Sequence, residues 1–379
     1  MTGETNFIPA EAFPPGEFLR DEMEERGWSQ VDLAEVLGKP TAAVNELVLG
    51  KREITPATAR SLAEAFGTSA QYWLNLESTY RLYLEAQKRT SDGAVARRAK
   101  LYEKAPVKDM IRRGWISGSS NIDVLERDVC DFLGIEAIDD EAPELAHAAR
   151  KSASYGSVTP ALRAWLCRAR AIASTAPVSA TFEKESTRRA ISELQLILPA
   201  AADVRQVARI LAENGIRMVV VETISKAKVD GVTMWLDDRS PVIALSLRYD
   251  RIDWFWFTLL HELVHVTRGD GKTIPIVDDL DERDDAPDSE RTANAQAQEW
   301  LVPADEMNDF IARTTPLYSR VKVENFAKRI KVHPGIVVGQ LQKRKEVEWS
   351  HFRTFLVKVR DLVTASTVTD GFGFAPLTF

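Results

Sequence analysis

The spacing of apolar residues divides the chain into a helical first half and a mixed second half. Residues 1–15 are rich in proline and predict an extended arm, and short helical patterns follow one another over residues 16–89. Residues 121–173 show helical spacing again and predict a connector, whereas the Ser-, Thr- and Pro-containing segment 174–181 predicts a loop. The sequence therefore indicates no strand in the first half.

A second folding unit begins near Ser186, where the period of the apolar positions changes. Helices are expected over 187–198 and 202–214, strands over 216–222, 232–236 and 242–247, a long helix from about 253, an acidic loop, a helix from about 289, and further helical structure from 303 to about 363. Gly215 is expected to end the second of these helices. The pattern predicts a mostly helical α+β fold with one short sheet.

Length and composition favour a multidomain protein of the cytoplasm. The 379 residues suggest two or three domains, and a formal net charge of −7 restricts any nucleic-acid binding to a local basic patch. Cys130 and Cys167 make no disulfide framework, which favours a reducing compartment. The most apolar stretch, 254–260, is far shorter than the roughly 20 residues of a membrane span, so we expect no membrane association.

Residues 261–265 read His-Glu-Leu-Val-His and lie inside the apolar segment that predicts the long helix. Two histidines four positions apart share one face of a helix, so His261 and His265 can both reach one ion at the roughly 2.0–2.1 Å that zinc requires. Glu262 is rotated away from them and can reach an attacking water without becoming a ligand. The alternative is a chance match on a core helix, which the cost of burying ionisable groups disfavours.

The third ligand that a catalytic zinc site needs is not a nearby histidine, because none lies between His265 and His333. Glu290 is the best candidate, since it begins a predicted helix on which Asn294 lies one turn further and can hydrogen-bond a ligating histidine. Two nitrogens and one carboxylate suit Zn²⁺ better than Mn²⁺. Alternatively, Glu290 is simply a first-turn acid that the helix dipole favours.

These residues carry a resemblance to a known family. The HExxH segment, Glu290-x-x-Ala293-Asn294 and Leu301-Val302-Pro303 resemble the ImmA/IrrE family of zinc metallopeptidases, with coverage of roughly residues 186–345. The resemblance implies a small thermolysin-like core, zinc ligands His261, His265 and Glu290, and Glu262 as the general base of an endopeptidase. One departure is Gln296, where the family commonly has an aromatic residue.

The expected chemistry is zinc polarising a carbonyl while Glu262 moves a proton from the attacking water to the leaving amine. The oxyanion needs a further donor, for which the candidates are Tyr249, Tyr318, His333 and His351. The edge of the strand over 242–247 is expected to bind an extended peptide by strand addition. The acidic residues 278–285 are interpreted either as an electrostatic lid or as a solvated loop.

The N-terminal helical patterns predict a helix-turn-helix. Ser29 caps a helix that ends at Gly38, Thr41 begins the next helix, and Thr55 caps a third. The expected DNA contacts are Lys39, Thr41, Ala42, Asn45, Glu46, Lys51 and Arg52. Because residues 20–60 hold six basic and eight acidic residues, a helical protein–protein module is the alternative.

This N-terminal segment also carries a resemblance, over about residues 13–85. Ser29-Gln30, Leu33-Ala34, Gly50-Lys51-Arg52 and Trp73-Leu74-Asn75-Leu76 are similar to the HigA-type antitoxins of the Xre class. The resemblance implies binding of operator DNA as a homodimer and, in many members, neutralisation of a toxin.

The sequence thus predicts a helix-turn-helix DNA-binding domain over 1–90, a helical connector over 91–185, a zinc metallopeptidase domain over 186–310 and a helical extension over 311–379. The expected function is transcription regulation together with zinc-dependent cleavage of a regulatory protein or a toxin. The alternative is a HigA-like repressor whose zinc domain is a sensor or scaffold without turnover. The intact Glu262 favours cleavage, because a scaffold requires no general base.

Overall fold

The computed structural model describes residues 12–88, 93–140, 159–272, 275–278 and 288–370. The chain separates into two compact units, Met1–Ala94 and Val95–Phe379. Among the described residues, none of the helices combines the length and the apolar character that crossing a bilayer requires.

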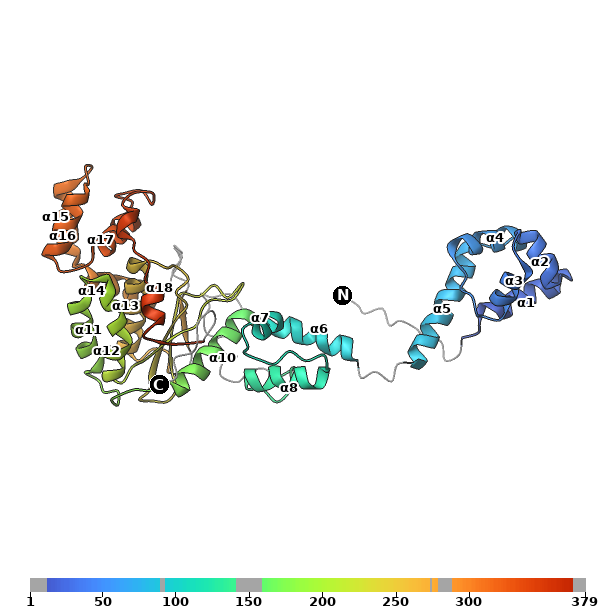
Figure 1. Cartoon of the computed structure of the whole chain (residues 1–379), viewed down its shortest axis with the longest axis horizontal. Helices are drawn as coiled ribbons and strands as arrows, with labels where there is room; N and C mark the ends of the chain where they lie inside the picture. The colour runs from blue at the N-terminus through green and yellow to red at the C-terminus, as the bar shows by residue number, and fades with distance from the viewer. Residues whose placement is uncertain (1–11, 89–92, 141–158, 273–274, 279–287, 371–379) are drawn as a thin grey trace. The chain divides into compact units, whose positions relative to one another are not determined.

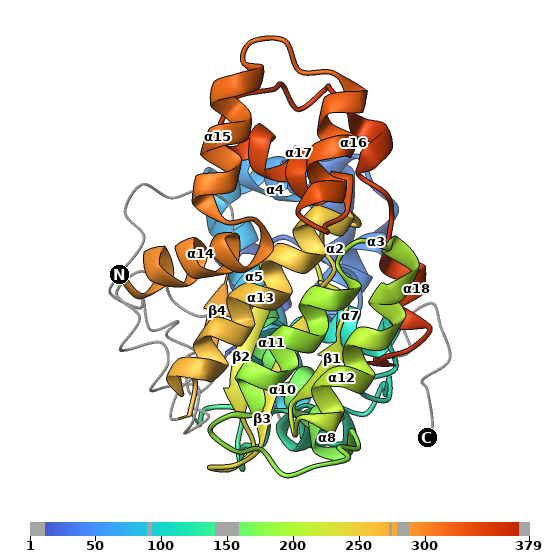
Figure 2. The same ribbon diagram turned by 90° about the vertical axis from the view of Figure 1, so that its left-hand side faces the viewer.

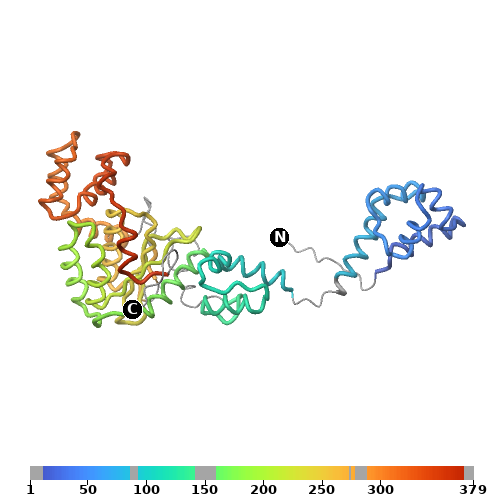
Figure 3. Tube along the Cα trace, in the orientation of Figure 1, coloured from blue at the N-terminus to red at the C-terminus, as the bar shows by residue number. Residues whose placement is uncertain are grey.

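The first unit is a bundle of short helices around one apolar core (Figure 1). Its helices are α1 (Pro15–Arg26), α2 (Gln30–Leu37), α3 (Thr41–Val48), α4 (Pro56–Phe66) and α5 (Ala70–Lys88). Ser29 and Asp32 form a capping box at the start of α2, and Gly38 ends it with φ 62°. The Cα trace in Figure 3 follows these turns in blue. The predicted helix-turn-helix geometry is therefore present.

The second unit combines a small sheet with many helices. They are α6 (Ala94–Lys104), α7 (Val107–Arg112), α8 (Ile122–Leu133), α10 (Pro160–Thr175), α11 (Ser186–Ile197), η1 (Ala201–Gln206), α12 (Val207–Glu213), α13 (Ile252–Arg268), α14 (Asp288–Leu301), α15 (Ala304–Thr314), α16 (Arg320–Arg329), α17 (Pro334–Lys343), η2 (Arg353–Phe355) and α18 (Arg360–Thr364).

The described strands form one mixed sheet in the order β4-β2-β3-β1-β5. They are β1 (Arg217–Val220), β2 (Gly231–Trp235), β3 (Pro241–Leu245), β4 (Ile276–Asp278) and β5 (Val368–Thr369). β1 is parallel to β3 and β5, whereas β2 is antiparallel to β3 and β4. Every residue of β2 and β3 is buried, which is why both strands are continuously apolar or small in the sequence.

The sheet lies between two layers of helices. Figures 1 and 2 show α11, α12 and α13 on one face and α10 on the other. α13 packs against β2 and β3, while α14 and α17 pack against α13. Phe255 and Trp256 of α13 enter the main core, where Trp256 is 0% exposed. This arrangement places the helix with the His-Glu-Leu-Val-His segment in the core of the unit.

The predicted mostly helical α+β class is confirmed, and several details differ from expectation. β4 and β5 were not predicted, because strands of three and two residues are too short to show a period of two. Residues 344–359, expected to be helical, contain turns and the short η2.

The expectation of an open sheet edge at 242–247 was wrong. β3 is hydrogen-bonded to β1 on one side and to β2 on the other, so its backbone groups are already paired. Among the described strands, the edges of the sheet are β4 and β5. A peptide that adds to this sheet would therefore pair with an edge strand and not with β3.

Candidate metal centre and nucleic-acid interface

α13 positions the two histidines of the candidate metal centre. This helix is apolar on nearly all sides, and its residues from Thr258 to Val266 are buried. His261 and His265 are four positions apart and therefore project from one face, both 0% exposed. Gly269 ends the helix in the left-handed conformation, φ 74°, and its backbone N–H bonds to the carbonyls of His265 and Val266.

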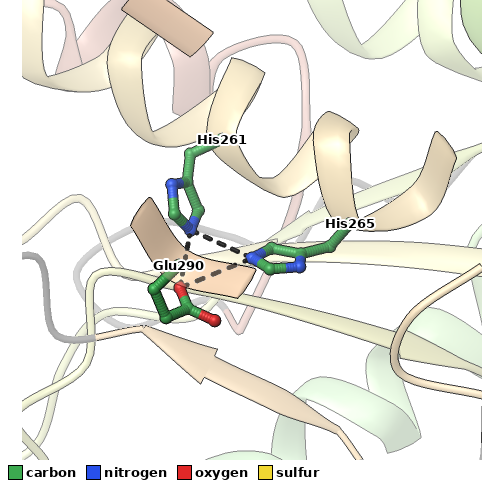
Figure 4. Close-up of side chains that lie close together, drawn as sticks. All are labelled: His261, His265 and Glu290. Carbon is green, nitrogen blue, oxygen red and sulfur yellow. Dashed lines mark hydrogen bonds and ion pairs between the residues drawn. The ribbon is translucent and has the colours of Figure 1, made fainter. Parts of the chain in front are cut away.

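The predicted third ligand lies beside them. Glu290, in the first turn of α14, places Oε2 3.3 Å from His261 Nε2 and 3.6 Å from His265 Nε2. The two Nε2 atoms are 3.1 Å apart, and Figure 4 shows all three side chains pointing toward one another. The three ligand atoms lie within 4.8 Å of one another. Residues 25 positions apart in the sequence are thus brought together, as the sequence predicts.

The donor set fits a divalent transition metal. Two imidazole nitrogens and one carboxylate oxygen, each from a buried side chain, converge at one place. Such a trio leaves room in a tetrahedral sphere for one further group. Because the set combines two imidazole nitrogens with one carboxylate oxygen, it suits Zn²⁺.

Asp270 is a residue that the sequence prediction missed. The C-terminal turn at Gly269 reverses the chain, and Asp270 accepts a hydrogen bond from His265 Nδ1 at 3.0 Å. With its Nδ1 proton held by this carboxylate, His265 directs the Nε2 lone pair toward His261 and Glu290. The available signal in the sequence was an acid directly after the glycine that ends the helix.

The side chain of Glu262 is held against the sheet. It is 0% exposed, and the Thr233 hydroxyl donates a hydrogen bond to its Oε2 at 2.7 Å. β2 passes so close that a Cβ on Gly231 would lie 2.1 Å from Glu262 Oε1. Glu262, the residue after the first histidine, is therefore held in place by contacts with β2.

The remaining candidates around the centre have other surroundings. The Asn294 side-chain oxygen is buried without a hydrogen-bond partner, so it accepts no bond from a histidine. The hydrogen bond from Asn294 to a ligating histidine therefore stays a prediction. Tyr318 donates to Glu346, and burial raises the pKa of its hydroxyl. His333 caps α17 by accepting from the Gly335 N–H, and burial lowers its pKa. Of the acidic segment, 279–285 lies outside the described residues.

The first unit presents the predicted DNA contacts on one surface. Thr41, Ala42, Asn45 and Glu46 are exposed on α3, whereas Val44, Leu47 and Val48 of the same helix are buried in the core. Lys51 and Arg52 follow α3 and are exposed, and Lys39 is half-buried. Arg52 forms an ion pair with Glu46 at 3.4 Å, which reduces the charge that both residues offer to a partner.

Comparisons with known proteins match the two units separately. A helix-turn-helix family model matches residues 19–73, and the model of the IrrE N-terminal-like domain, Peptidase_M78, matches residues 216–341. Virulence-associated protein I of Dichelobacter nodosus is 40% identical over 81 residues, covering 21% of this chain and 75% of that protein. The uncharacterized HTH-type transcriptional regulator YddM of Escherichia coli (strain K12) is 32% identical over 74 residues, with coverage of 20% and 78%.

Solved structures are similar to part of the chain only. The Pseudomonas aeruginosa antitoxin HigA with the higBA promoter is 37% identical, with coverage of 22% of this chain and 95% of that one and a TM-score of 0.21. A HigA-family addiction module antidote protein from Coxiella burnetii is 37% identical, with coverage of 21% and 86% and a TM-score of 0.20. From the family models and the sequence relatives, the chain belongs to the Xre-type helix-turn-helix family in its first unit and carries an IrrE-like domain of the M78 peptidase family in its second.

Proposed function

We propose that this DNA-binding regulator is also a zinc-dependent endopeptidase that cleaves a regulatory protein or a toxin. The observation that carries the proposal is the convergence of His261, His265 and Glu290, with the carboxyl group of Glu262 on the next residue of the same helix. A buried helix that carries ionisable side chains needs a compensating partner, and a divalent cation supplies one for all three ligands.

Each residue around the centre has a separate role in the proposed hydrolysis of a peptide bond. When bound, a divalent cation supplies Lewis acidity toward a substrate carbonyl and toward water. Glu262 takes the proton of the attacking water at its carboxylate and passes it to the leaving amine. Thr233 fixes one oxygen of that carboxylate, which orients the other. Asp270 keeps the His265 ring in the orientation that ligation requires.

Replacing Glu262 by Gln tests the proposed role of this carboxylate. The amide keeps the shape of the side chain but does not accept a proton, so we expect unchanged zinc content and a cleavage rate lower by about 10²–10⁴-fold. Zinc content is measured by elemental analysis, and cleavage by intact mass spectrometry of candidate regulators, toxins and the chain itself. Glu136→Gln, at an exposed position of the second unit, is the matched control. Wild-type cleavage by Glu262→Gln refutes the assignment.

A second candidate function is a metal sensor or scaffold without turnover. It is favoured by the burial of the centre, in which His261, His265 and Glu262 are 0% exposed and Glu290 is 8% exposed. In that case zinc changes the affinity for operator DNA equally in the wild type and in Glu262→Gln, and no protein substrate is cleaved by either. Cleavage by the wild type alone supports the endopeptidase.

Substitutions on the helix-turn-helix surface are expected to change the affinity for DNA. Lys51→Gln removes a phosphate contact, so we expect weaker binding to all DNA sequences and a salt-dependence slope reduced by about 1. Asn45→Ala removes a base contact and should cost about 1–3 kcal/mol at the selected operator only. Operators are selected from a random-sequence pool, and binding is measured by fluorescence anisotropy over a salt series. Arg60→Gln on α4 is the control, and equal effects of all three variants contradict the proposed surface.

A further inference from the structure

A cavity lies in the peptidase-like unit, among α13, α14 and α17. Its volume is about 60 Å³, whereas roughly 10–15 Å³ suffices for one water molecule. Most of its wall is apolar or aromatic, formed by Trp254, Phe257, Leu301, Ile336 and Trp349. None of the three proposed metal ligands lines it, so the cavity is distinct from the metal centre.

Two buried polar atoms of this wall lack a hydrogen-bond partner among the described residues. They are Trp254 Nε1, a donor, and Gln340 Oε1, an acceptor. Gln340 is 9% exposed, and its Nε2 donates to the carbonyl of Gln298 at 3.2 Å, which fixes the amide and leaves Oε1 as the available atom. Buried polar groups in native proteins are normally paired. Two residues of the lining thus carry an unpaired donor and an unpaired acceptor, which a ligand with complementary groups would satisfy.

The charge on the wall of the cavity favours an anion. Lys343 and Arg344 contribute to the lining, and the Lys343 ammonium lies 5.9 Å from the centre of the Phe257 ring. The one acidic residue of the lining, Asp253, already forms an ion pair with Arg251 at 2.7 Å. The lining thus carries two cations against one carboxylate, which favours a negatively charged ligand.

The cavity is also connected to the metal centre through one side chain. Phe257 lines the cavity and lies one helical turn before His261, with ring centroids 6.1 Å apart. A ligand that contacts Phe257 therefore acts on the side chain packed against a proposed zinc ligand. Interiors are close-packed, so such contacts transmit small displacements.

We propose that this cavity binds a small planar aromatic anion that carries an N–H donor, and that its occupancy alters the metal affinity of the centre through Phe257. The aromatic ring fills the apolar wall, the N–H donates to Gln340, and the anionic group accepts from Trp254 or meets Lys343. Binding of the ligand does not depend on the proposed peptidase function, whereas the effect on metal affinity rests on it.

Indole-3-acetate is the probe, because it combines an aromatic ring, an N–H donor and a carboxylate. Binding to the full chain is measured by isothermal titration calorimetry and saturation-transfer NMR. We expect a Kd on the order of 1 mM or tighter. Neutral indole-3-ethanol should bind several-fold more weakly, and acetate should not compete at equal concentration.

Two variants locate the site. Lys343→Gln at the surface should weaken binding of indole-3-acetate about 3–10-fold without affecting indole-3-ethanol, since a single exposed charge contributes modestly. Ile336→Trp should fill the cavity and abolish binding of both probes. Lys328→Gln, exposed on α16 and not part of the lining, is the matched control. Absence of binding by the wild type, or binding unchanged in both cavity variants, overturns the site.

The link to the metal centre is tested by titrating Zn²⁺ with and without saturating indole-3-acetate. We expect the zinc affinity to change at least about twofold, and the probe affinity to change by the same factor when zinc is present, because coupling is reciprocal. An unchanged zinc affinity overturns the coupling. If the chain binds no zinc at all, the proposed function fails, while probe binding still decides the cavity by itself.

Discussion

Replacing Glu290 by Gln should abolish the stabilisation that Zn²⁺ gives to the wild-type protein. A ligand that binds only the folded state stabilises it by about 2.7 kcal/mol at a hundredfold excess over its Kd. For a unit of this size, that corresponds to a rise in Tm of about 5–10 °C. Glu290 supplies the one carboxylate among the three converging ligand atoms, so its loss leaves two neutral imidazoles, a pair that holds zinc weakly.

The measurement is a thermal melt of each variant with Zn²⁺ and with a chelator. His265→Ala should behave like Glu290→Gln, because each removes one of three ligands. Asp270→Asn should retain the site with an affinity about 10–100-fold lower, since it weakens the contact that orients His265. Asp238→Asn, in an exposed turn, is the matched control. A full Tm shift in Glu290→Gln shows that the ion is held elsewhere.

The second large effect is expected from Gly231→Ala, which adds a single methyl group. The new Cβ would lie 2.1 Å from Glu262 Oε1 and 2.9 Å from Thr258 Cγ2, both of them buried. Either β2 moves away from α13 or the Glu262 carboxylate rotates out of its contact with Thr233. We expect a loss of about 1–3 kcal/mol in the free energy of unfolding, as for other overpacked sites.

Urea denaturation measures the stability, and the cleavage assay measures the displacement of Glu262. Gly118→Ala is a suitable control, because its new Cβ would lie no closer than 3.1 Å to its nearest neighbour, Ile111 Cγ2. Glu262→Asp shortens the acid by one methylene and should restore part of the stability lost in Gly231→Ala. Additive effects of these two substitutions would show that the carboxylate and β2 are not in contact.

The helical half of the candidate site could be predicted from the sequence because its signals are local. A period of 3.6 residues places His261 and His265 on one face, and Gly269 marks the end of their helix. The buried side chains around them also follow from the high density of apolar residues in this segment. The same kind of local signal predicted the capped helices of the first unit, where Ser29 marks the start of α2 and Gly38 marks its end.

Other features follow from packing between segments that are distant in the sequence. The sequence placed the edge for peptide binding at 242–247, but the pairing of β3 on both sides closes that edge. The pairing partners of a strand depend on all strands of the sheet, and β4 and β5 are too short to be recognised from a sequence pattern. The close approach of Gly231 to Glu262 likewise depends on how β2 and α13 pack.

By itself, the sequence determined the two classes of domain, the pair of histidines and the acid between them, because residues within one helix have fixed relative positions. The tertiary structure decided that Glu290, which the sequence offered either as a ligand or as a first-turn acid, meets the histidines. It also decided that Asp270 turns back onto His265 and that an apolar cavity adjoins Phe257. Those contacts join residues of different elements, and their distances depend on the packing of buried side chains, which no local pattern records.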